Sequence, residues 1–167
     1  MRTIGKERGA SAPDPDPRKN RERGDDEAGT AVVRSWLESK SINTKGLAIR
    51  DGSGLSRLDL ITPETTGRLL AAMTSSNSAT AFHDSLPVAG RDGTLNSRLK
   101  KLTGRIFAKT GTLTYTHSLS GYATTPTNET LIFSIICNEA TDRNAVRVID
   151  EIASAIADFQ PGASLKR

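Results

Sequence analysis

The sequence predicts an α+β fold in which antiparallel strands are covered by helices. Three strand-like runs follow one another closely, over residues 104–112, 117–124 and 130–138, and short gaps between such runs are typical of antiparallel hairpins. Helical spacing of apolar residues dominates the first half of the chain and returns after the last run. Helices, then an antiparallel meander, then a covering helix define this fold class.

The composition predicts one folded domain with a charged arm. The chain has 167 residues, which is enough for one ordinary domain and too few for two. In residues 1–24, prolines alternate with aspartates before a charge cluster, so we expect a disordered, linker-like arm. Seven basic and four acidic residues give this arm most of the net charge of +4. We expect the folded part over 25–160 and a short tail over 161–167.

The distribution of charged and apolar residues predicts that the chain neither binds nucleic acid nor crosses a membrane. A nucleic-acid-binding domain would carry its basic footprint on the folded part, so we expect no nucleic-acid partner. No apolar run reaches the roughly 18–20 residues of a membrane helix, so we expect no transmembrane segment. The start of the chain, MRTIGKERGA, lacks the apolar stretch of a signal peptide. Cys137 is the only cysteine, so no internal disulfide can form.

The first half of the chain predicts two helices separated by a strand. In 25–40, acidic residues begin a helix whose apolar residues share one face: Val32, Val33, Trp36 and Leu37. The stretch GLAIRDGSGLSR (46–57) predicts a short strand and a glycine-rich turn. Thr62 is a good N-cap for the second helix, and Pro63 suits its first position. Leu69, Leu70 and Met73 form its apolar stripe.

The second half predicts a loop, the meander and a last helix. The stretch HDSLPVAGRDGTLNSRL (83–99) resembles a loop. The third strand run is almost entirely apolar, so we expect both of its faces to be buried. Thr141 and Asp142 begin a helix that ends near Phe159. Its stripe for packing on the sheet consists of Val146, Ile149, Ile152, Ala153 and Ile156.

Lys109 lies in the middle of a strand run, in AKTGTLT (108–114). A Walker A phosphate loop is rejected, because Gly104 is one residue too close to Lys109 and Ala108 replaces the second glycine. The residues alone leave two interpretations of Lys109. It is an edge charge that discourages aggregation, or a cation that meets an anionic substrate.

Other catalytic and metal motifs are weaker. His83 and His117 are the only histidines, and they lie far apart without metal-ligand spacing, so we expect no metal site. The turn Gly52-Ser53-Gly54 lacks the Gly-x-Ser-x-Gly spacing of an α/β-hydrolase nucleophile, so Ser53 is interpreted as a turn residue.

A set of short segments carries a family resemblance. These are DGSGLSR, the helix that opens with Thr-Pro, LPVAGRDGTL, FAKTGTL and SGYAT. Their order and spacing over roughly residues 25–158 resemble class C penicillin-binding proteins, the serine-type D-alanyl-D-alanine carboxypeptidases and endopeptidases that trim peptidoglycan. The resemblance implies a partial penicillin-binding, transpeptidase-like fold whose early strands are missing.

The resemblance also implies a serine acyl-transferase site with Ser-x-x-Lys, Ser-x-Asn and Lys-Thr-Gly motifs. Lys109 would lie beside the nucleophile and add positive potential. The hydroxyls of Thr110 and Thr112 would bind the terminal carboxylate of the substrate, and Gly111 would let its backbone approach. The backbone N–H of Thr112 would be an oxyanion donor. The implied ligands are a peptidoglycan stem peptide ending in D-Ala-D-Ala and β-lactams as its mimics, and the resemblance implies no metal or organic cofactor.

The nucleophile motif is absent from its expected place before DGSGLSR. Ser97 to Lys100 matches Ser-x-x-Lys, and Ser41 to Asn43 and Ser75 to Asn77 match Ser-x-Asn, but at positions that do not fit the family. We therefore expect an inactive, truncated fragment of a family enzyme that works in the periplasm or cell envelope.

Two alternatives stay open. One is a non-catalytic peptidoglycan-binding module, and the other is an unrelated small α+β domain in which KTGT is only a hairpin edge. If early strands are missing, the sheet has an open edge, which predicts self-association.

Overall fold

A computed structural model describes residues 26–140 and 144–160 of the chain. It confirms the predicted α+β class. Strands β1 (Ile106–Leu113), β2 (Thr116–Thr124) and β3 (Thr130–Cys137) form an antiparallel sheet in the order β1-β2-β3. The predicted arm, 1–24, and tail, 161–167, lie outside the described residues.

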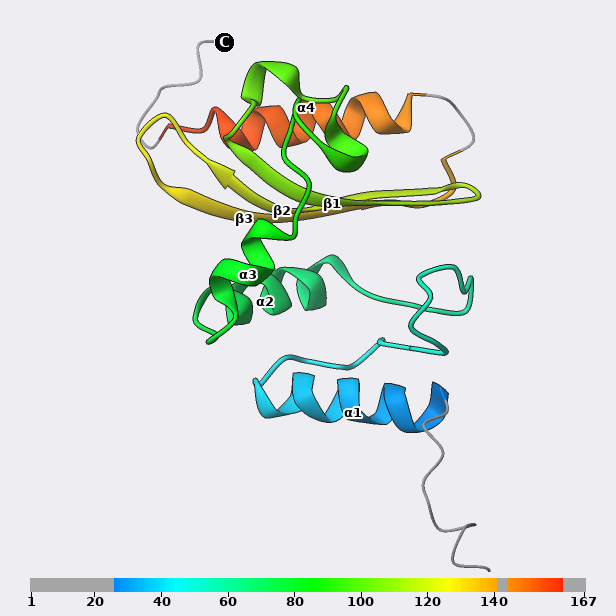
Figure 1. Ribbon diagram of the computed structural model, residues 1–167. Helices are drawn as coiled ribbons and strands as arrows, with labels where there is room; N and C mark the ends of the chain where they lie inside the picture. Colours follow the sequence, from blue (N-terminus) through cyan, green and yellow to red (C-terminus); the bar gives the residue numbers. More distant parts are fainter. Residues whose placement is uncertain (1–25, 141–143, 161–167) are drawn as a thin grey trace, which may run out of the picture.

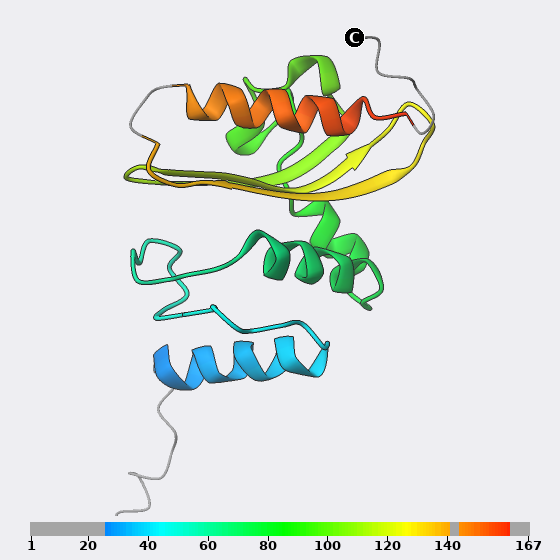
Figure 2. The ribbon, with the colours of Figure 1, turned by 180° about the vertical axis from the view of Figure 1, so that it is seen from behind.

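The helices form layers on the two faces of this sheet. Helix α4 (Ala145–Ala157) covers one face, and helices α2 (Pro63–Thr74) and α3 (Ala79–Asp84) lie at the other (Figure 1). Helix α1 (Asp26–Ser39) forms the outermost layer, beyond α2 (Figure 1), and the view from behind shows the same order (Figure 2). None of the helices in the described residues is long and apolar enough to cross a membrane.

The main core lies between the sheet and α4. Ile106, Ala108 and Leu119 are fully buried there, together with Ile149 and Ala153 from the helix. Successive side chains of a strand point to opposite faces, so the residues between them face α2. Phe107 and Tyr122, which oppose each other in the register, pack on that side against Leu70 and Leu86.

Helix α2 begins as the sequence predicts. The Thr62 hydroxyl accepts a hydrogen bond from the backbone N–H of Thr65 at 3.0 Å, and Pro63 occupies the first helical position. Leu70 is buried, whereas Leu69 is only partly buried and packs toward α1.

The structure corrects three of the sequence predictions in the first hundred residues. Only Leu37 of the predicted α1 face is buried, and Val32 and Trp36 remain 68% and 38% exposed. The strand predicted in 46–57 is reduced to one bridge between Ala48 and Leu60. The predicted loop 83–99 contains the end of α3 with His83, and a 3-10 turn at Gly93–Leu95.

The strand β3 also differs from its prediction. Phe133 is buried, but Ile132 is 37% exposed, because β3 is an edge strand of the described sheet and has a neighbour on one side only. The last helix is confirmed from Ala145. Its predicted start at Thr141 and Asp142 lies outside the described residues.

Candidate functional site

The outer edge of β1 is covered along its first half only. There the backbone N–H of Ala108 donates to the carbonyl of Pro87 at 3.0 Å, and the N–H of Ala89 donates to the carbonyl of Ile106 at 3.0 Å. From Lys109 onward no strand of the described residues pairs with this edge. The Lys-Thr-Gly segment is therefore a free strand edge.

The direction of the backbone groups on this edge follows from the strand geometry. N–H and C=O groups of alternate residues in a strand point to the same side. Because Ile106 and Ala108 bond toward the outer edge, Thr110 and Thr112 point their N–H and C=O groups the same way. Such an edge can bind an extended peptide by main-chain hydrogen bonds. The Thr112 N–H, predicted as the oxyanion donor, lies on this free edge.

Lys109 supplies a positive charge at the same edge. Its side chain is exposed on the α2 face, and its Nζ donates to the carbonyl of Thr110 at 2.5 Å. That carbonyl points outward, so the ammonium lies beside the free backbone groups. None of the ion pairs within the described residues involves Lys109. The charge is thus available to an anion that approaches the edge.

Thr110 and Gly111 both lie close to side chains from other segments of the chain. The Thr110 hydroxyl lies on the α4 face, opposite to Lys109, and donates to the Thr94 hydroxyl at 2.8 Å. A Cβ atom at Gly111 would lie 2.3 Å from Oγ of Ser118. Glycine is therefore favoured here by the neighbouring strand, in addition to any substrate. The carboxylate-binding roles of the Thr110 and Thr112 hydroxyls stay predictions.

A row of serines beside Lys109 was missed by the sequence reasoning. Ser120 stands opposite Lys109 in the register, and Ser134 stands opposite Ser120, with 2.9 Å between the two hydroxyl oxygens. The alternation in HSLSGYAT carries a signal for this row, because Ser118 and Ser120 fall on one face and Leu119 on the other. The row makes the α2 face of the sheet polar next to the lysine.

The other sequence candidates do not gather at this edge. Ser97 and Lys100 line a surface pocket with Val146 and Asp150 of α4, on the face of the sheet opposite to the Lys109 side chain. Within a turn, Oδ1 of Asp51 accepts hydrogen bonds from the Ser53 hydroxyl at 2.6 Å and from the Ser53 backbone N–H at 2.8 Å. These two hydrogen bonds lower the pKa of the Asp51 carboxyl.

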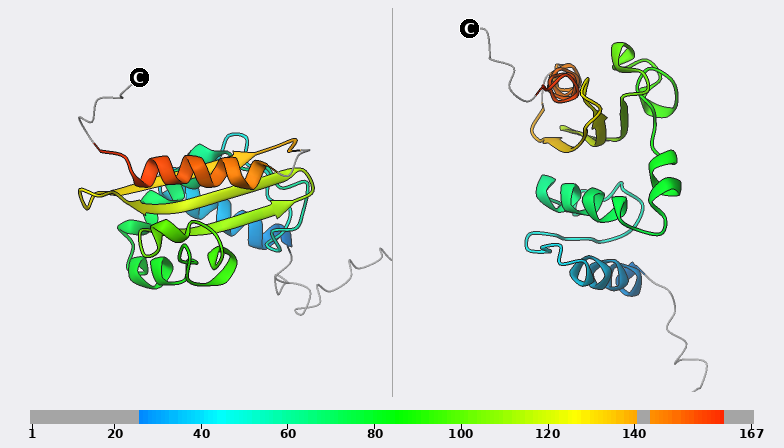
Figure 3. Two further views of the ribbon diagram at one scale, coloured as in Figure 1. Left: turned by 90° about the horizontal axis from the view of Figure 1, so that it is seen from above. Right: turned by 90° about the vertical axis from the view of Figure 1, so that its left-hand side faces the viewer.

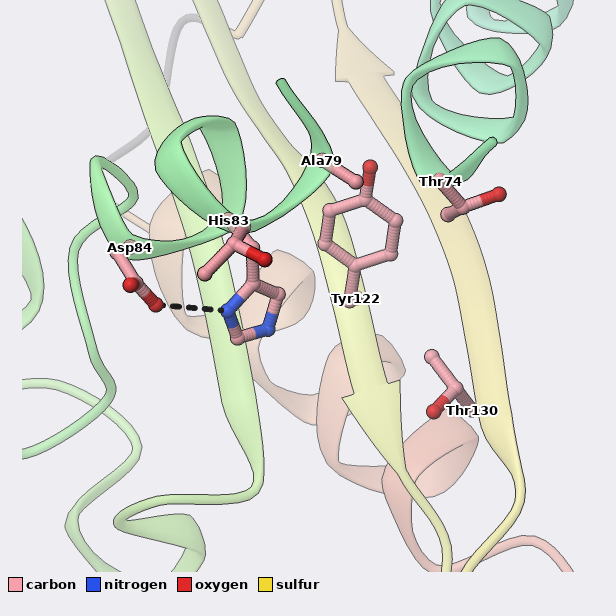
Figure 4. Close-up of a pocket in the computed structure, with 7 residues that line it drawn as sticks. Thr74, Ala79, His83, Asp84, Tyr122 and Thr130 are labelled. Carbon is pink, nitrogen blue, oxygen red and sulfur yellow. Dashed lines mark ion pairs between the residues drawn. The ribbon is translucent and has the colours of Figure 1, made fainter. Parts of the chain in front are cut away.

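The two histidines lie on opposite faces of the sheet, so they cannot share a metal ion. His83 packs against Phe107 on the α2 face, with 4.2 Å between ring centroids. His117 stands next to Leu119 on β2 in register with Cys137, on the α4 face. His83 also lines a pocket of about 300 Å³ with Thr74, Ala79, Thr80, Asp84, Tyr122 and Thr130 (Figure 4).

This pocket is built around a buried tyrosine. The Tyr122 hydroxyl donates to the Leu70 carbonyl at 2.8 Å, and burial raises the pKa of Tyr122. Nδ1 of His83 lies 3.5 Å from Oδ1 of Asp84. Because the imidazole ring stacks on Phe107 and approaches Tyr122, its contacts connect α3 with the sheet.

The chain has the arrangement of the penicillin-binding and β-lactamase class of fold. In this class a Lys-Thr-Gly strand forms one edge of the sheet, and helices cover both of its faces. Solved structures of this class superpose on the chain. A β-lactamase from Sphaerobacter thermophilus matches with a TM-score of 0.61 and 22% identity, covering 78% of this chain and 53% of that one. At this identity the likeness concerns the fold alone.

The sequence comparison is more specific. Residues 18–158 match the D-Ala-D-Ala carboxypeptidase 3 (S13) family, and the chain belongs to this family, which confirms the predicted resemblance. A D-alanyl-D-alanine carboxypeptidase of Actinomadura sp. (strain R39) is 38% identical over 140 residues, which are 80% of this chain and 26% of that protein.

Penicillin binding protein 4 of Haemophilus influenzae, solved in complex with a β-lactam, matches with a TM-score of 0.75 and 25% identity. The match covers 84% of this chain and 36% of that one. The chain thus spans about a quarter to a third of the length of these relatives.

Proposed function

We propose that the free edge of β1 is the substrate-binding wall of a serine-type D-Ala-D-Ala carboxypeptidase of the cell envelope. The observation that carries this proposal is the combination of outward backbone groups at Thr110 and Thr112 with the ammonium of Lys109, which lies beside the Thr110 carbonyl and forms no ion pair within the described residues. A stem peptide would lie along β1 as an added strand. Its terminal carboxylate would be attracted by Lys109 in a charge-assisted hydrogen bond.

The reaction that we propose for the intact enzyme is the one that membership of the family implies. A serine would attack the terminal peptide bond, release D-alanine and form an acyl-enzyme that water hydrolyses. The oxygen of the attacked carbonyl gains negative charge, and the Thr112 N–H would donate to it. Removing one such donor typically costs about 3 kcal/mol of transition-state stabilisation. A β-lactam would occupy the same edge as a substrate mimic.

We further propose that this chain alone binds such ligands without being acylated. Its single Ser-x-x-Lys match, Ser97 to Lys100, borders α4, and the Lys109 side chain projects from the opposite face of the sheet. A catalytic serine has to lie within hydrogen-bond reach of its base. A non-catalytic peptidoglycan-binding module would use the same edge in the same way.

The binding step is tested on the isotope-labelled chain by NMR, with a short peptide ending in D-Ala-D-Ala. We expect the amide signals of Thr110 and Thr112 to shift, and Lys109→Ala to weaken binding about tenfold or more, since a hydrogen bond to a charged group contributes about 1.5–3 kcal/mol. The controls are Lys101→Ala, which removes an exposed lysine from the pocket beside α4, and the same peptide with a C-terminal amide. Equal binding by wild type and Lys109→Ala would contradict the proposal.

Acylation is tested separately with a fluorescent penicillin. We expect no covalent label on the purified chain. A label that is lost in Ser97→Ala would show that this serine reacts, and would overturn the second proposal while leaving the binding edge intact.

A further inference from the structure

A threonine of the loop before β1 lies where the free edge of this strand begins. Thr94 is exposed on the 3-10 turn Gly93–Leu95, and its hydroxyl oxygen lies 2.8 Å from that of Thr110. Figure 3 shows the loop that carries this turn beside β1, and Figure 1 shows it on the same side of the sheet as α4. Thr94 therefore adds a side chain to the edge from a different segment of the chain.

The turn that carries Thr94 is held in place on both sides. Leu95, the next residue, is fully buried in the main core, and its carbonyl accepts from the N–H of Gly90 at 2.9 Å. Before the turn, Oδ1 of Asp92 accepts from the N–H of Val88 at 2.8 Å. The Thr94 hydroxyl is thus exposed but carried by a fixed backbone, which lowers the entropy lost when a ligand binds to it.

The two neighbouring hydroxyl groups have one proton left for a ligand. Each hydroxyl carries a single O–H donor, and the Thr110 hydroxyl uses its own in the bond to Thr94. The Thr94 hydroxyl donates to no acceptor within the described residues. Hydrogen bonds in a chain polarise one another, so accepting from Thr110 makes Thr94 a stronger donor. The free proton of the pair therefore belongs to Thr94.

The proposed function brings an anion next to this proton. If the attacked carbonyl accepts from the Thr112 N–H and the terminal carboxylate lies toward Lys109, the ligand runs antiparallel to β1. One residue beyond that carbonyl is about 3.4 Å along an extended chain, which brings the carboxylate close to Thr110. Further along, the edge is already paired, because the N–H of Ala108 donates to the carbonyl of Pro87. The ligand chain therefore has to end beside Thr94.

We propose that Thr94 is a further substrate-binding residue of this site, and that its hydroxyl donates to the terminal carboxylate of the stem peptide. The Lys109 ammonium reaches the edge from the α2 face, and Thr94 reaches it from the α4 face, so each oxygen of the carboxylate finds a donor. This inference rests on the proposed function. It assigns to Thr94 the contact that the family resemblance implies for the hydroxyl of Thr110.

The charges of the loop are compatible with an anion beside Thr94. Asp92 is the only acidic residue in 85–103. Its Oδ2 lies 3.2 Å from Nε of Arg91, so its charge is compensated within the loop. A hydrogen bond from a hydroxyl to a carboxylate is charge-assisted, and such bonds are about twice as strong as those between neutral groups.

NMR titration of the isotope-labelled chain with two short peptides tests the inference. One peptide ends in D-Ala-D-Ala, and the other ends in D-Ala ethylamide, which lacks the terminal carboxylate. Thr94→Val keeps the shape of the side chain without its hydroxyl, so it should raise the dissociation constant of the first peptide about tenfold and leave that of the second unchanged. Thr94→Ser should restore the wild-type value. The matched control, Thr80→Val, removes an exposed hydroxyl of α3 and should change neither constant.

Thr110→Val separates the two hydroxyl groups. It leaves the Thr94 proton in place, so it should weaken binding of the D-Ala-D-Ala peptide less than Thr94→Val does. The opposite order would return the contact to Thr110 and overturn the inference. So would an unchanged affinity in Thr94→Val, or an equal loss for both peptides. In each of these cases, weaker binding by Lys109→Ala would still support the proposed function, whereas equal binding by wild type and Lys109→Ala would contradict both.

Discussion

Gly111 and Gly121 lie on neighbouring strands, yet the structure needs them for different reasons. A Cβ at Gly121 would lie 2.1 Å from the carbonyl oxygen of Phe107 and 2.6 Å from Cα of Ala108. These are backbone atoms of a paired strand and cannot move away without opening the ladder. A Cβ at Gly111 meets the end of a serine side chain, Oγ of Ser118, which can rotate to another staggered position.

We therefore expect Gly121→Ala to lower the free energy of unfolding by about 3 kcal/mol, at the upper end of overpacking effects. Gly111→Ala should lower it by less than about 1 kcal/mol. Urea denaturation followed by circular dichroism measures both values. Similar losses for the two variants would show that the β1–β2 ladder shifts more easily than its register suggests.

The buried hydroxyl of Tyr122 makes stability depend on pH in the alkaline range. Burial raises the pKa of Tyr122 above its ordinary value of 10.0, so the folded state holds this proton more tightly than the unfolded state. The protonated Tyr122 hydroxyl therefore contributes to the free energy of unfolding. This contribution is complete below pH 10 and is lost as the pH rises from 10 through the pKa of the folded state. We expect the wild type to lose more stability than Tyr122→Phe between pH 9 and 11, as measured by thermal unfolding. Parallel curves for the two proteins would contradict this.

At the scale of elements, the start of α2 is encoded locally. The Thr62 hydroxyl accepts from the Thr65 N–H, and this bond satisfies one of the free donors of the first turn. Thr62→Ala should lower the free energy of unfolding by about 1 kcal/mol, and Thr62→Ser should restore most of it. Chemical denaturation of the wild type and the two variants measures these free energies. If Thr62→Ser loses as much stability as Thr62→Ala, the effect comes from the methyl group of Thr62 and not from its hydroxyl.

The sequence predicted the meander well, because hairpins are local. Strand alternation and short turns fixed β1, β2 and β3 to within about two residues at each end. The strand predicted in 46–57 was wrong, because the single Ala48–Leu60 bridge is all the pairing that this segment finds. The environment of Lys109 was only partly predictable. That Lys109 lies on a strand can be predicted from its neighbours in the sequence. That Ser120 and Ser134 lie beside it depends on the register of all three strands, which the sequence pattern does not reveal.

The whole molecule has more than one apolar cluster, and this limits what helix patterns can predict. The main core joins the sheet to α4, whereas α1 is held by a small separate cluster of Leu37, Ile42 and Leu47. The guanidinium of Arg34 adds one hydrogen bond to the Leu47 carbonyl at 2.9 Å. The apolar pattern of α1 correctly indicates a helix. It cannot tell which of its residues find a neighbour, so Val32 and Trp36 stay exposed.

This separation predicts that the layers unfold in steps. Leu37→Ala removes the buried contact of α1, at a cost of about 2–3 kcal/mol for a large-to-small change in a small cluster, and should speed amide hydrogen exchange in α1 while the amides of β2 keep their protection. Ile149→Ala is the matched change in the main core, where the side chain is 2% exposed. It should reduce protection in β2 and α4 together. If Leu37→Ala accelerates exchange in β2 as strongly as in α1, the two clusters unfold as one unit, and α1 is as firmly part of the domain as the sheet.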